Sequence, residues 1–253
     1  PNEHKAGVFM HIHLTGARLV ERMTERERAI AARVESVLPE LRALMTDAER
    51  ESVLRFVKDF AKPGETLIAG TNAPSTAGVI ANTRRARELG YDTVLLALPF
   101  YTKPTQAEIV RHFKAVLDAA NVNIVLYSYP DKDGVEIGWE ALDGLADHPR
   151  IIGIKESSGS LQRAIGIATR YEGRIQLVSG SDDIALDFML WGADSWICGP
   201  ANCMARAVCD LDRTFRAGDL SGAKAIMTRI WPAMNFLESG KFVQKLKYGC
   251  ELQ

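Results

Sequence analysis

The chain has 253 residues, of which 47% are hydrophobic and 25% charged, and its formal net charge is −1. This is the composition of an ordinary globular protein, and its near-neutral charge creates no field that attracts nucleic acid or an anionic membrane. No apolar run reaches the ~20 residues of a membrane helix, and no signal-peptide pattern opens the sequence. We therefore expect a cytoplasmic protein with no nucleic-acid or membrane partner. The cysteines lack zinc-like spacing and are expected to be reduced core thiols: Cys198, Cys203, Cys209 and Cys250.

The N-terminal part is expected to contain two strands and two helices. Residues 7–14 form an apolar run typical of a strand, and apolar residues from Leu19 to Leu38 recur at helical spacing. A second strand is expected near residues 34–38. An amphipathic helix is expected over residues 48–60.

From residue 66 onward, short strand-like runs alternate with amphipathic segments such as 76–89 and 106–119. The runs are 66–71, 93–99, 123–129, 151–157, 175–180 and 195–199. Parallel strands need crossover connections, which helices supply, so this alternation predicts a parallel sheet covered by helices. Eight units in about 250 residues predict an α/β fold, a single (β/α)8 TIM barrel domain over residues 1–253, in which the C-terminal helices can be truncated. No GxGxxG follows a strand, which disfavours an open doubly wound sheet.

Lys155 ends an apolar run in the segment IIGIKESSG. In a (β/α)8 barrel the reacting groups lie at the carboxyl ends of strands, where this lysine is placed. Apolar surroundings disfavour the ammonium form, and the free amine attacks ketones to form a Schiff base. The alternative is a structural lysine that reaches solvent or pairs with Glu156. Position alone leaves both interpretations open.

Two tyrosines near the ends of the preceding strands are candidate proton-transfer groups. Tyr127 lies in the run before that of Lys155, and Tyr101 follows the run before that. Schiff-base formation expels water from a carbinolamine and needs a proton shuttle, which a phenol can supply. Each tyrosine alone is better explained as half-buried core. Their joint placement at strand ends favours catalysis.

A resemblance to a known family rests on four segments: GYDTVLLALPFYTKPTQAEIVRHFKAV, NIVLYSYP, IIGIKESSGS and LVSGSDDIALDFMLWGA. They resemble successive signatures of the dihydrodipicolinate synthase and N-acetylneuraminate lyase family, over about residues 45–250. The resemblance implies a class I aldolase-type lyase that binds pyruvate or another 2-keto acid as an imine on Lys155, without metal or organic cofactor. It implies that Tyr127 is the proton-transfer phenol and that Tyr101 acts across a subunit contact of a homotetramer or homodimer. It also implies that Gly180 lies on the pocket wall and Thr71 near the site.

Two departures from the family pattern bear on the substrate. The family binds the keto-acid carboxylate with a GxTGE-like turn, and here the corresponding stretch reads SVLPELR, with Glu40 as the only remnant. Synthases that use aspartate semialdehyde carry an arginine where this chain has Lys132, a poorer fork for a carboxylate. That lysine favours the alternative of a 2-keto-3-deoxy sugar acid undergoing aldol cleavage or dehydration. Ser128 is a further candidate for substrate contact, or else a strand-end serine in water.

Two rival classes of function remain beside the Schiff-base lyase. His11 and His13 alternate at the end of the first expected strand, as metal ligands do in amidohydrolase barrels, but the other histidines do not complete a ligand set. A barrel that has lost activity is the second rival, because the carboxylate-binding turn is missing. The adjacent Asp182 and Asp183 resemble a metal-binding pair, although helix N-capping by Asp182 or Ser181 is the simpler interpretation.

Overall fold

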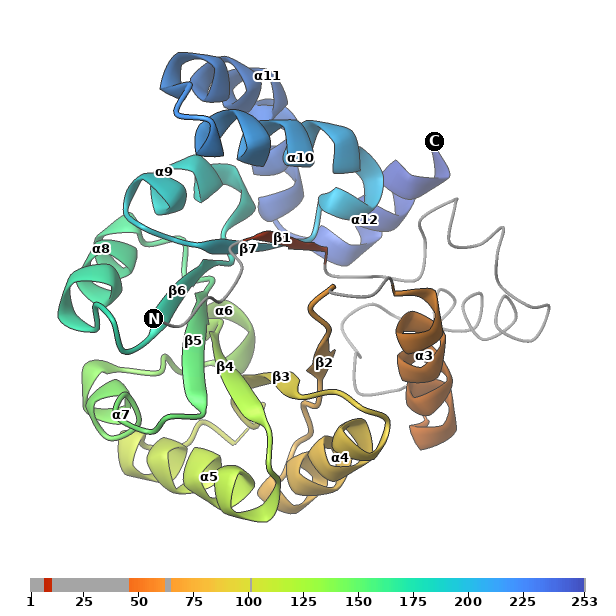
Figure 1. The fold of residues 1–253 in the computed structure, drawn as a ribbon, viewed down its shortest axis with the longest axis vertical. Coiled ribbons are helices and arrows are strands. Elements are labelled where there is room, and N and C mark those ends of the chain that lie inside the picture. The colour runs from red at the N-terminus through yellow and green to blue at the C-terminus, as the bar shows by residue number, and fades with distance from the viewer. Residues whose placement is uncertain (1–6, 11–45, 62–64, 101, 253) are drawn as a thin grey trace. The chain divides into compact units, whose positions relative to one another are not determined.

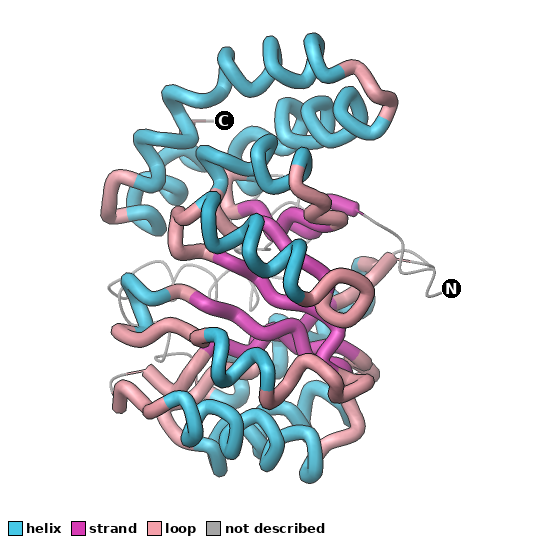
Figure 2. Tube along the Cα trace, turned by 90° about the vertical axis from the view of Figure 1, so that its left-hand side faces the viewer, coloured by secondary structure: helices cyan, strands magenta, loops and turns pink. Residues whose placement is uncertain are grey.

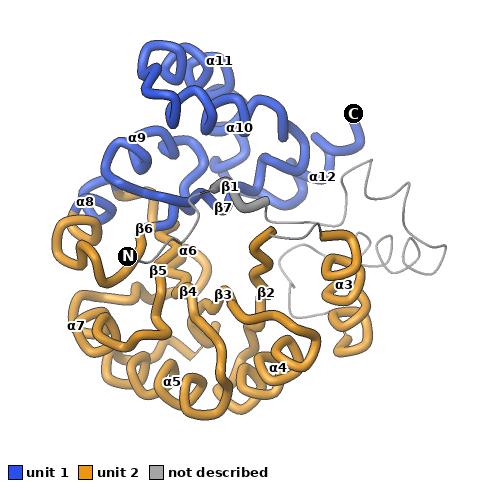
Figure 3. Tube along the Cα trace, viewed as in Figure 1, with its two compact units in different colours: residues 1–44, 161–165, 178–253 blue, residues 45–160, 166–177 orange. Residues whose placement is uncertain are grey.

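The computed structural model describes residues 7–10, 46–61, 65–100 and 102–252. The chain divides into two compact units that interleave along the sequence (Figure 3). Unit 1 comprises residues 1–44, 161–165 and 178–253, and unit 2 comprises residues 45–160 and 166–177. The single domain expected over residues 1–253 stays a prediction.

Unit 2 contains four parallel strands that pair in the order in which they occur in the chain. They are β2 (Ile68–Gly70), β3 (Thr93–Ala97), β4 (Asn123–Ser128) and β5 (Ile151–Glu156). Helices precede and connect them (Figure 1): α3 (Asp47–Phe60), α4 (Thr76–Glu88), α5 (Gln106–Ala119), and after β4 the short α6 (Pro130–Asp133) and α7 (Trp139–Asp143). The predicted alternation of parallel strands and helices is confirmed here.

Apolar continuity explains these strands, and one-sided apolar spacing explains the helices. All five residues of β3 are buried, as expected for a parallel strand covered on both faces. Helix α5 buries the four apolar residues that its spacing predicts: Ile109, Phe113, Val116 and Leu117. It begins at a capping box in which Thr105 and Glu108 satisfy each other's backbone N–H groups. Figure 2 shows helices and strands alternating along the trace.

An irregularity in pairing brings Lys155 opposite Tyr127. Ile124 of β4 pairs with Ile151 of β5, yet the next residue of β4, Val125, pairs with Gly153, so β5 has one extra residue at this point. From there the register runs on to pair Tyr127 with Lys155. Side chains alternate between the faces of a strand, so the extra residue puts Lys155 on the face that Tyr127 occupies.

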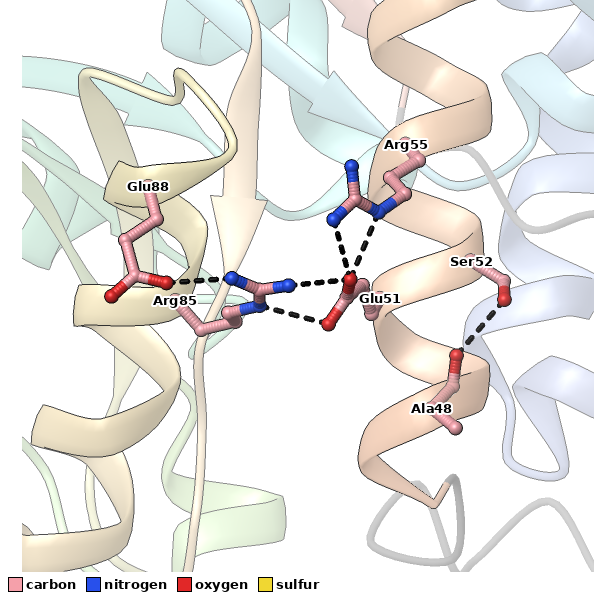
Figure 4. Close-up of polar contacts among 6 residues, drawn as sticks. All are labelled: Ala48, Glu51, Ser52, Arg55, Arg85 and Glu88. Carbon is pink, nitrogen blue, oxygen red and sulfur yellow. Dashed lines mark hydrogen bonds and ion pairs between the residues drawn. The ribbon is translucent and has the colours of Figure 1, made fainter.

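An ion cluster on the surface of unit 2 joins α3 to α4 (Figure 4). The Arg85 guanidinium donates to both carboxylate oxygens of Glu51, through Nε at 2.8 Å and Nη2 at 2.5 Å. Arg55 donates to the same carboxylate, and Arg85 also donates to Glu88. These cations, Arg85 first, lower the pKa of Glu51 to about 2, and the pKa of Arg85 is raised in turn. The cluster is solvent-exposed, so its contribution to folding is small.

Unit 1 contains β1 (Gly7–Met10), which pairs in parallel with β7 (Ser195–Cys198). Strand β6 (Gln176–Ser179) crosses the boundary between the units, and its last two residues also pair with β7. The helices are α8 (Leu161–Arg170), which crosses the same boundary, the 3-10 turn η2 (Asp182–Ile184), α9 (Ala185–Leu190), α10 (Ala201–Arg216), α11 (Leu220–Glu238) and α12 (Phe242–Glu251). Trp196 of β7 belongs to a buried cluster with apolar residues of α10 and α11.

Three outcomes in unit 1 bear on the sequence predictions. The predicted N-cap role of Ser181 or Asp182 is wrong, because neither η2 nor α9 has a side-chain cap. Asp182 is buried and its Oδ1 instead accepts a hydrogen bond from the Trp196 indole, at 2.8 Å. All four cysteines are free thiols, as predicted, but only Cys198 and Cys203 are buried, whereas Cys250 is partly exposed and Cys209 is exposed.

The predicted strand at residues 34–38 and the helical pattern before it lie outside the described residues. Among the residues that the structure does describe, no helix is both long and apolar enough to cross a membrane. The parallel pairing of the described strands establishes the α/β character of the fold, and the eighth strand stays a prediction.

Candidate functional site

The side chains of Lys155 and Tyr127 meet near the carboxyl ends of β5 and β4. Each is the residue before the last one of its strand. The Lys155 Nζ lies 4.3 Å from the centroid of the Tyr127 ring, and only 5% of Lys155 and 6% of Tyr127 is exposed. This burial contradicts the alternative in which Lys155 reaches the solvent. Glu156 follows Lys155 directly in the strand, so the two side chains point to opposite faces.

Tyr129 is a residue of this site that the sequence interpretation missed. Its ring stacks on that of Tyr127, with centroids 5.8 Å apart and an interplanar angle of 29°. The two tyrosines are two residues apart in an extended segment and therefore share a face. The spacing of the two tyrosines in YSY is a sequence signal for this arrangement, although the family resemblance implies a role for Tyr127 alone.

Asp133 is a second missed residue, located at the end of α6. Only 7% of it is exposed, and burial raises the pKa of its carboxyl group to about 7, although backbone hydrogen bonds with Tyr129 and Leu98 act in the opposite direction. Its Oδ2 has no hydrogen-bond partner among the described residues. Because Leu98 follows β3 and Tyr129 follows β4, this carboxyl group connects the carboxyl ends of two neighbouring strands.

Thr71 and Asn72 follow β2 and tie its end to neighbouring elements. The buried Thr71 Oγ1 accepts a hydrogen bond from the Thr83 hydroxyl of α4 at 3.0 Å. Asn72 Oδ1 accepts from the backbone N–H of Ala97, the last residue of β3, at 2.8 Å. These contacts are structural, and the predicted role of Thr71 near the substrate stays a prediction.

Ser128 and Lys132 lie beyond Tyr127 in very different environments. Ser128 is fully buried, which contradicts its interpretation as a serine in water, and its Oγ has no partner among the residues described. Ser128 pairs with Glu156 in the register and faces away from Tyr127. Lys132 is exposed on α6. Substrate contact by either residue stays a prediction.

The other predicted site residues are not assembled around Lys155 by the described structure. Gly180 follows β6 in unit 1, and its place on the pocket wall stays a prediction. Tyr101, Glu40, His11 and His13 lie outside the described residues. Within the described ranges, no group of three or more His, Cys, Asp or Glu side chains is arranged to hold a metal ion.

Comparison with known proteins confirms the predicted family. Residues 41–253 match the dihydrodipicolinate synthetase family. The 4-hydroxy-tetrahydrodipicolinate synthase of Geobacter sulfurreducens is 38% identical over 203 residues, which cover 79% of this chain and 70% of that protein. The corresponding synthase of Trichlorobacter lovleyi is 39% identical over 182 residues, which cover 72% of this chain but only 63% of its own length. The chain thus spans about two thirds of these relatives.

Solved structures lead to the same assignment. The dihydrodipicolinate synthase of Acinetobacter baumannii, in a complex with pyruvate, has a TM-score of 0.79 and 30% identity, with 88% of this chain and 79% of that chain covered. The 4-hydroxy-tetrahydrodipicolinate synthase of Methylacidiphilum fumariolicum has a TM-score of 0.81 and 26% identity, with 93% and 82% covered. By its sequence match over most of its length, the chain belongs to the dihydrodipicolinate synthetase family.

Proposed function

We propose that this protein is a Schiff-base-forming lyase or synthase that acts on pyruvate or a related 2-keto acid. The observation that carries the proposal is the contact between a buried amine and a buried phenol ring, Lys155 and Tyr127, at the carboxyl ends of adjacent strands. This is the edge at which parallel α/β barrels perform their chemistry. Membership of the dihydrodipicolinate synthetase family and the pyruvate complex of the Acinetobacter baumannii enzyme support it.

The proposed reaction begins with attack of the Lys155 amine on the keto carbon. The resulting carbinolamine loses its oxygen as water, with protons carried by the Tyr127 phenol, and leaves a protonated imine. The imine withdraws electrons from the adjacent carbon, so a proton can leave there and a bond can form or break. Hydrolysis then releases the product and restores the amine. The imine is itself the electron sink, so the residues present fit a reaction without metal or organic cofactor.

The surroundings of Lys155 suit both the amine and the cation that forms on it. The Lys155 side chain is buried at the end of its strand, where a bound 2-keto acid would meet the amine away from bulk water. An aromatic face attracts a cation, and the Tyr127 ring therefore also stabilises the protonated imine. Tyr101, which the sequence places after β3, is proposed to assist the proton transfers from a neighbouring subunit of a homotetramer or homodimer.

Trapping of the imine tests the proposal. The protein is incubated with pyruvate and borohydride, and the reduced adduct is located by peptide mass spectrometry. We expect one adduct, on Lys155, and no adduct in the variant Lys155→Arg. The variant Lys114→Arg is the matched control, because it changes an exposed lysine of the same unit that has no proposed role, and it should still be trapped. No adduct on the unaltered protein would exclude the proposed chemistry and favour a barrel that has lost activity.

Lys132 is the reason for proposing a second class of substrate. An ammonium group binds a carboxylate as a point charge and lacks the bidentate geometry of arginine. A 2-keto-3-deoxy sugar acid, undergoing aldol cleavage or dehydration, is therefore proposed as the alternative to condensation with aspartate semialdehyde. Pyruvate release from sugar acids, compared with pyruvate consumption in the presence of aspartate semialdehyde, distinguishes the two substrate classes.

We also propose that residues 1–253 form a closed eight-stranded barrel. The similarity of the chain to the solved structures of dihydrodipicolinate synthases supports this.

A further inference from the structure

Tyr129 is an aromatic residue that the proposed chemistry does not use, although its ring touches the proposed proton-transfer residue. The stacking of its ring on Tyr127 places it in direct contact with the group that must present its hydroxyl to the imine. We infer that Tyr129 is a positioning residue, whose ring holds the phenol of Tyr127 in the orientation required beside Lys155. This inference rests on the proposed function and deepens it.

The backbone of Tyr129 is held by the short helix that follows it. Proline at the next position disfavours the helical conformation for Tyr129, and its φ of −135° and ψ of 75° lie outside the helical region. The Tyr129 carbonyl accepts hydrogen bonds from the N–H groups of Lys132 and Asp133, both at 2.9 Å. Gly134 ends the helix in the left-handed conformation, with φ +74°, that glycine tolerates best.

A buried carboxyl group ties this segment to the neighbouring strand. Asp133 makes backbone hydrogen bonds with Tyr129 and with Leu98, which follows β3. Gln106, at the start of α5, donates to the carbonyl of Glu136 at 3.0 Å and accepts from the N–H of Gly138 at 2.8 Å. The segment that carries Tyr129 is therefore fixed on both sides of α6.

A rigid neighbour matters because Tyr127 lies near the end of β4 and contacts Lys155 through its ring. Rotation of the Tyr127 side chain changes where its hydroxyl lies relative to the imine, even when the backbone is unchanged. A displacement of about 1 Å in a reacting group lowers rates by about 100-fold. Stacked aromatic rings resist such rotation, and phenylalanine preserves the stack whereas an aliphatic residue does not.

Proton exchange at carbon 3 of pyruvate in D2O, followed by NMR, measures the step that depends on Tyr127. The variants are Tyr129→Phe, which keeps the ring, and Tyr129→Leu, which removes it while keeping an apolar side chain. We expect Tyr129→Phe to exchange within about 3-fold of the unaltered protein, since only a hydroxyl is lost. We expect Tyr129→Leu to exchange about 10 to 100 times more slowly, by the displacement argument. Borohydride trapping at equilibrium should still label Lys155 in both variants.

Other results would refute either the positioning role of Tyr129 or the proposed function itself. Equal exchange rates in all three proteins, with normal trapping, would refute the positioning role while leaving the proposed function intact. Slow exchange in Tyr129→Phe would also refute it, because the hydroxyl rather than the ring would then matter. If trapping fails in the unaltered protein, the proposed function fails and this inference with it. Thermal unfolding shows whether Tyr129→Leu is folded, and if it is not, Tyr129→Met replaces it under the same expectation.

Discussion

Replacement of His112 is expected to change how the stability of the protein depends on pH. His112 lies on α5 with only 5% of its surface exposed, and its Nδ1 is 2.9 Å from the Thr76 hydroxyl of α4. Its Nε2 is buried without a partner among the residues described. A protonated Nε2 would be removed from water, and among the described residues it has no acceptor to bind. Burial therefore lowers the pKa of His112 from 6.5 to about 4.

The direction of the effect follows from where the protons bind. Below pH 6.5 the unfolded chain takes up a proton at His112 that the folded protein does not, so stability falls as the pH falls, until about pH 4. The difference of ~2.5 units between the two pKa values corresponds to about 3 kcal/mol at about 1.4 kcal/mol per unit, which is the upper end of the expected effect.

Asp133 acts in the opposite direction over an overlapping interval. Its pKa in the folded protein is about 7, above the ordinary value of 3.8, so its stabilising contribution is complete below pH 3.8 and is lost as the pH rises through 7. The pH profile of the unaltered protein therefore contains both effects. The difference between the stability profiles of the unaltered protein and a His112 variant gives the contribution of the histidine, provided that His112 and Asp133 act independently.

The measurement is urea-induced unfolding of the unaltered protein and of His112→Leu between pH 8 and pH 4.5. We expect the variant to gain stability relative to the unaltered protein as the pH falls, by about 1 to 3 kcal/mol across this range. His148→Gln is the control, because His112 is intact in it and the loss on acidification should persist. Parallel profiles for His112→Leu and the unaltered protein would refute the argument from burial.

Three further substitutions test other contacts. Tyr127→Phe should slow pyruvate proton exchange by about 100-fold to 10,000-fold, the usual contribution of a positioned acid or base, and unchanged exchange would remove the phenol from the mechanism. Trp196→Phe should lower the free energy of unfolding by about 1 to 3 kcal/mol, because it removes the indole N–H that donates a hydrogen bond to the buried Asp182. Urea unfolding measures this loss, and an unchanged free energy would show that the bond is dispensable. Glu51→Gln should lower the unfolding temperature slightly at low salt and not at high salt, because the exposed ion cluster with Arg85 is screened; a salt-independent loss would contradict this.

The strands after residue 66 were predictable because each is a continuous apolar run that a parallel sheet buries on both faces. The run at residues 93–99 contains β3, and the run at 151–157 contains β5, with differences of a few residues at the carboxyl ends. Helix α5 was predictable to the residue, because its capping threonine and its apolar spacing are local signals. Lys155 and Tyr127 were predictable as strand-end groups for the same reason.

Other features depend on contacts between segments that are distant in the sequence. The burial of Asp133 follows from its bonds to the ends of two strands, and nothing in PDKDG distinguishes it from the exposed Asp131. The stacking of Tyr129 on Tyr127 depends on the backbone that α6 holds in place. Similarly, the Asp182 side chain looked like a helix cap in the sequence, but the tertiary fold brings the Trp196 indole to it.

The sequence by itself determined which segments become strands and helices and which residues stand at the strand ends, because these properties depend on local apolar patterning. It did not determine which residues face one another. The extra residue between Ile151 and Gly153 decides that Lys155 shares a face with Tyr127, and only the pairing of β4 with β5 reveals it. A shift of one residue moves a side chain to the other face of a sheet, so the register of the paired strands, more than their composition, assembles the candidate site.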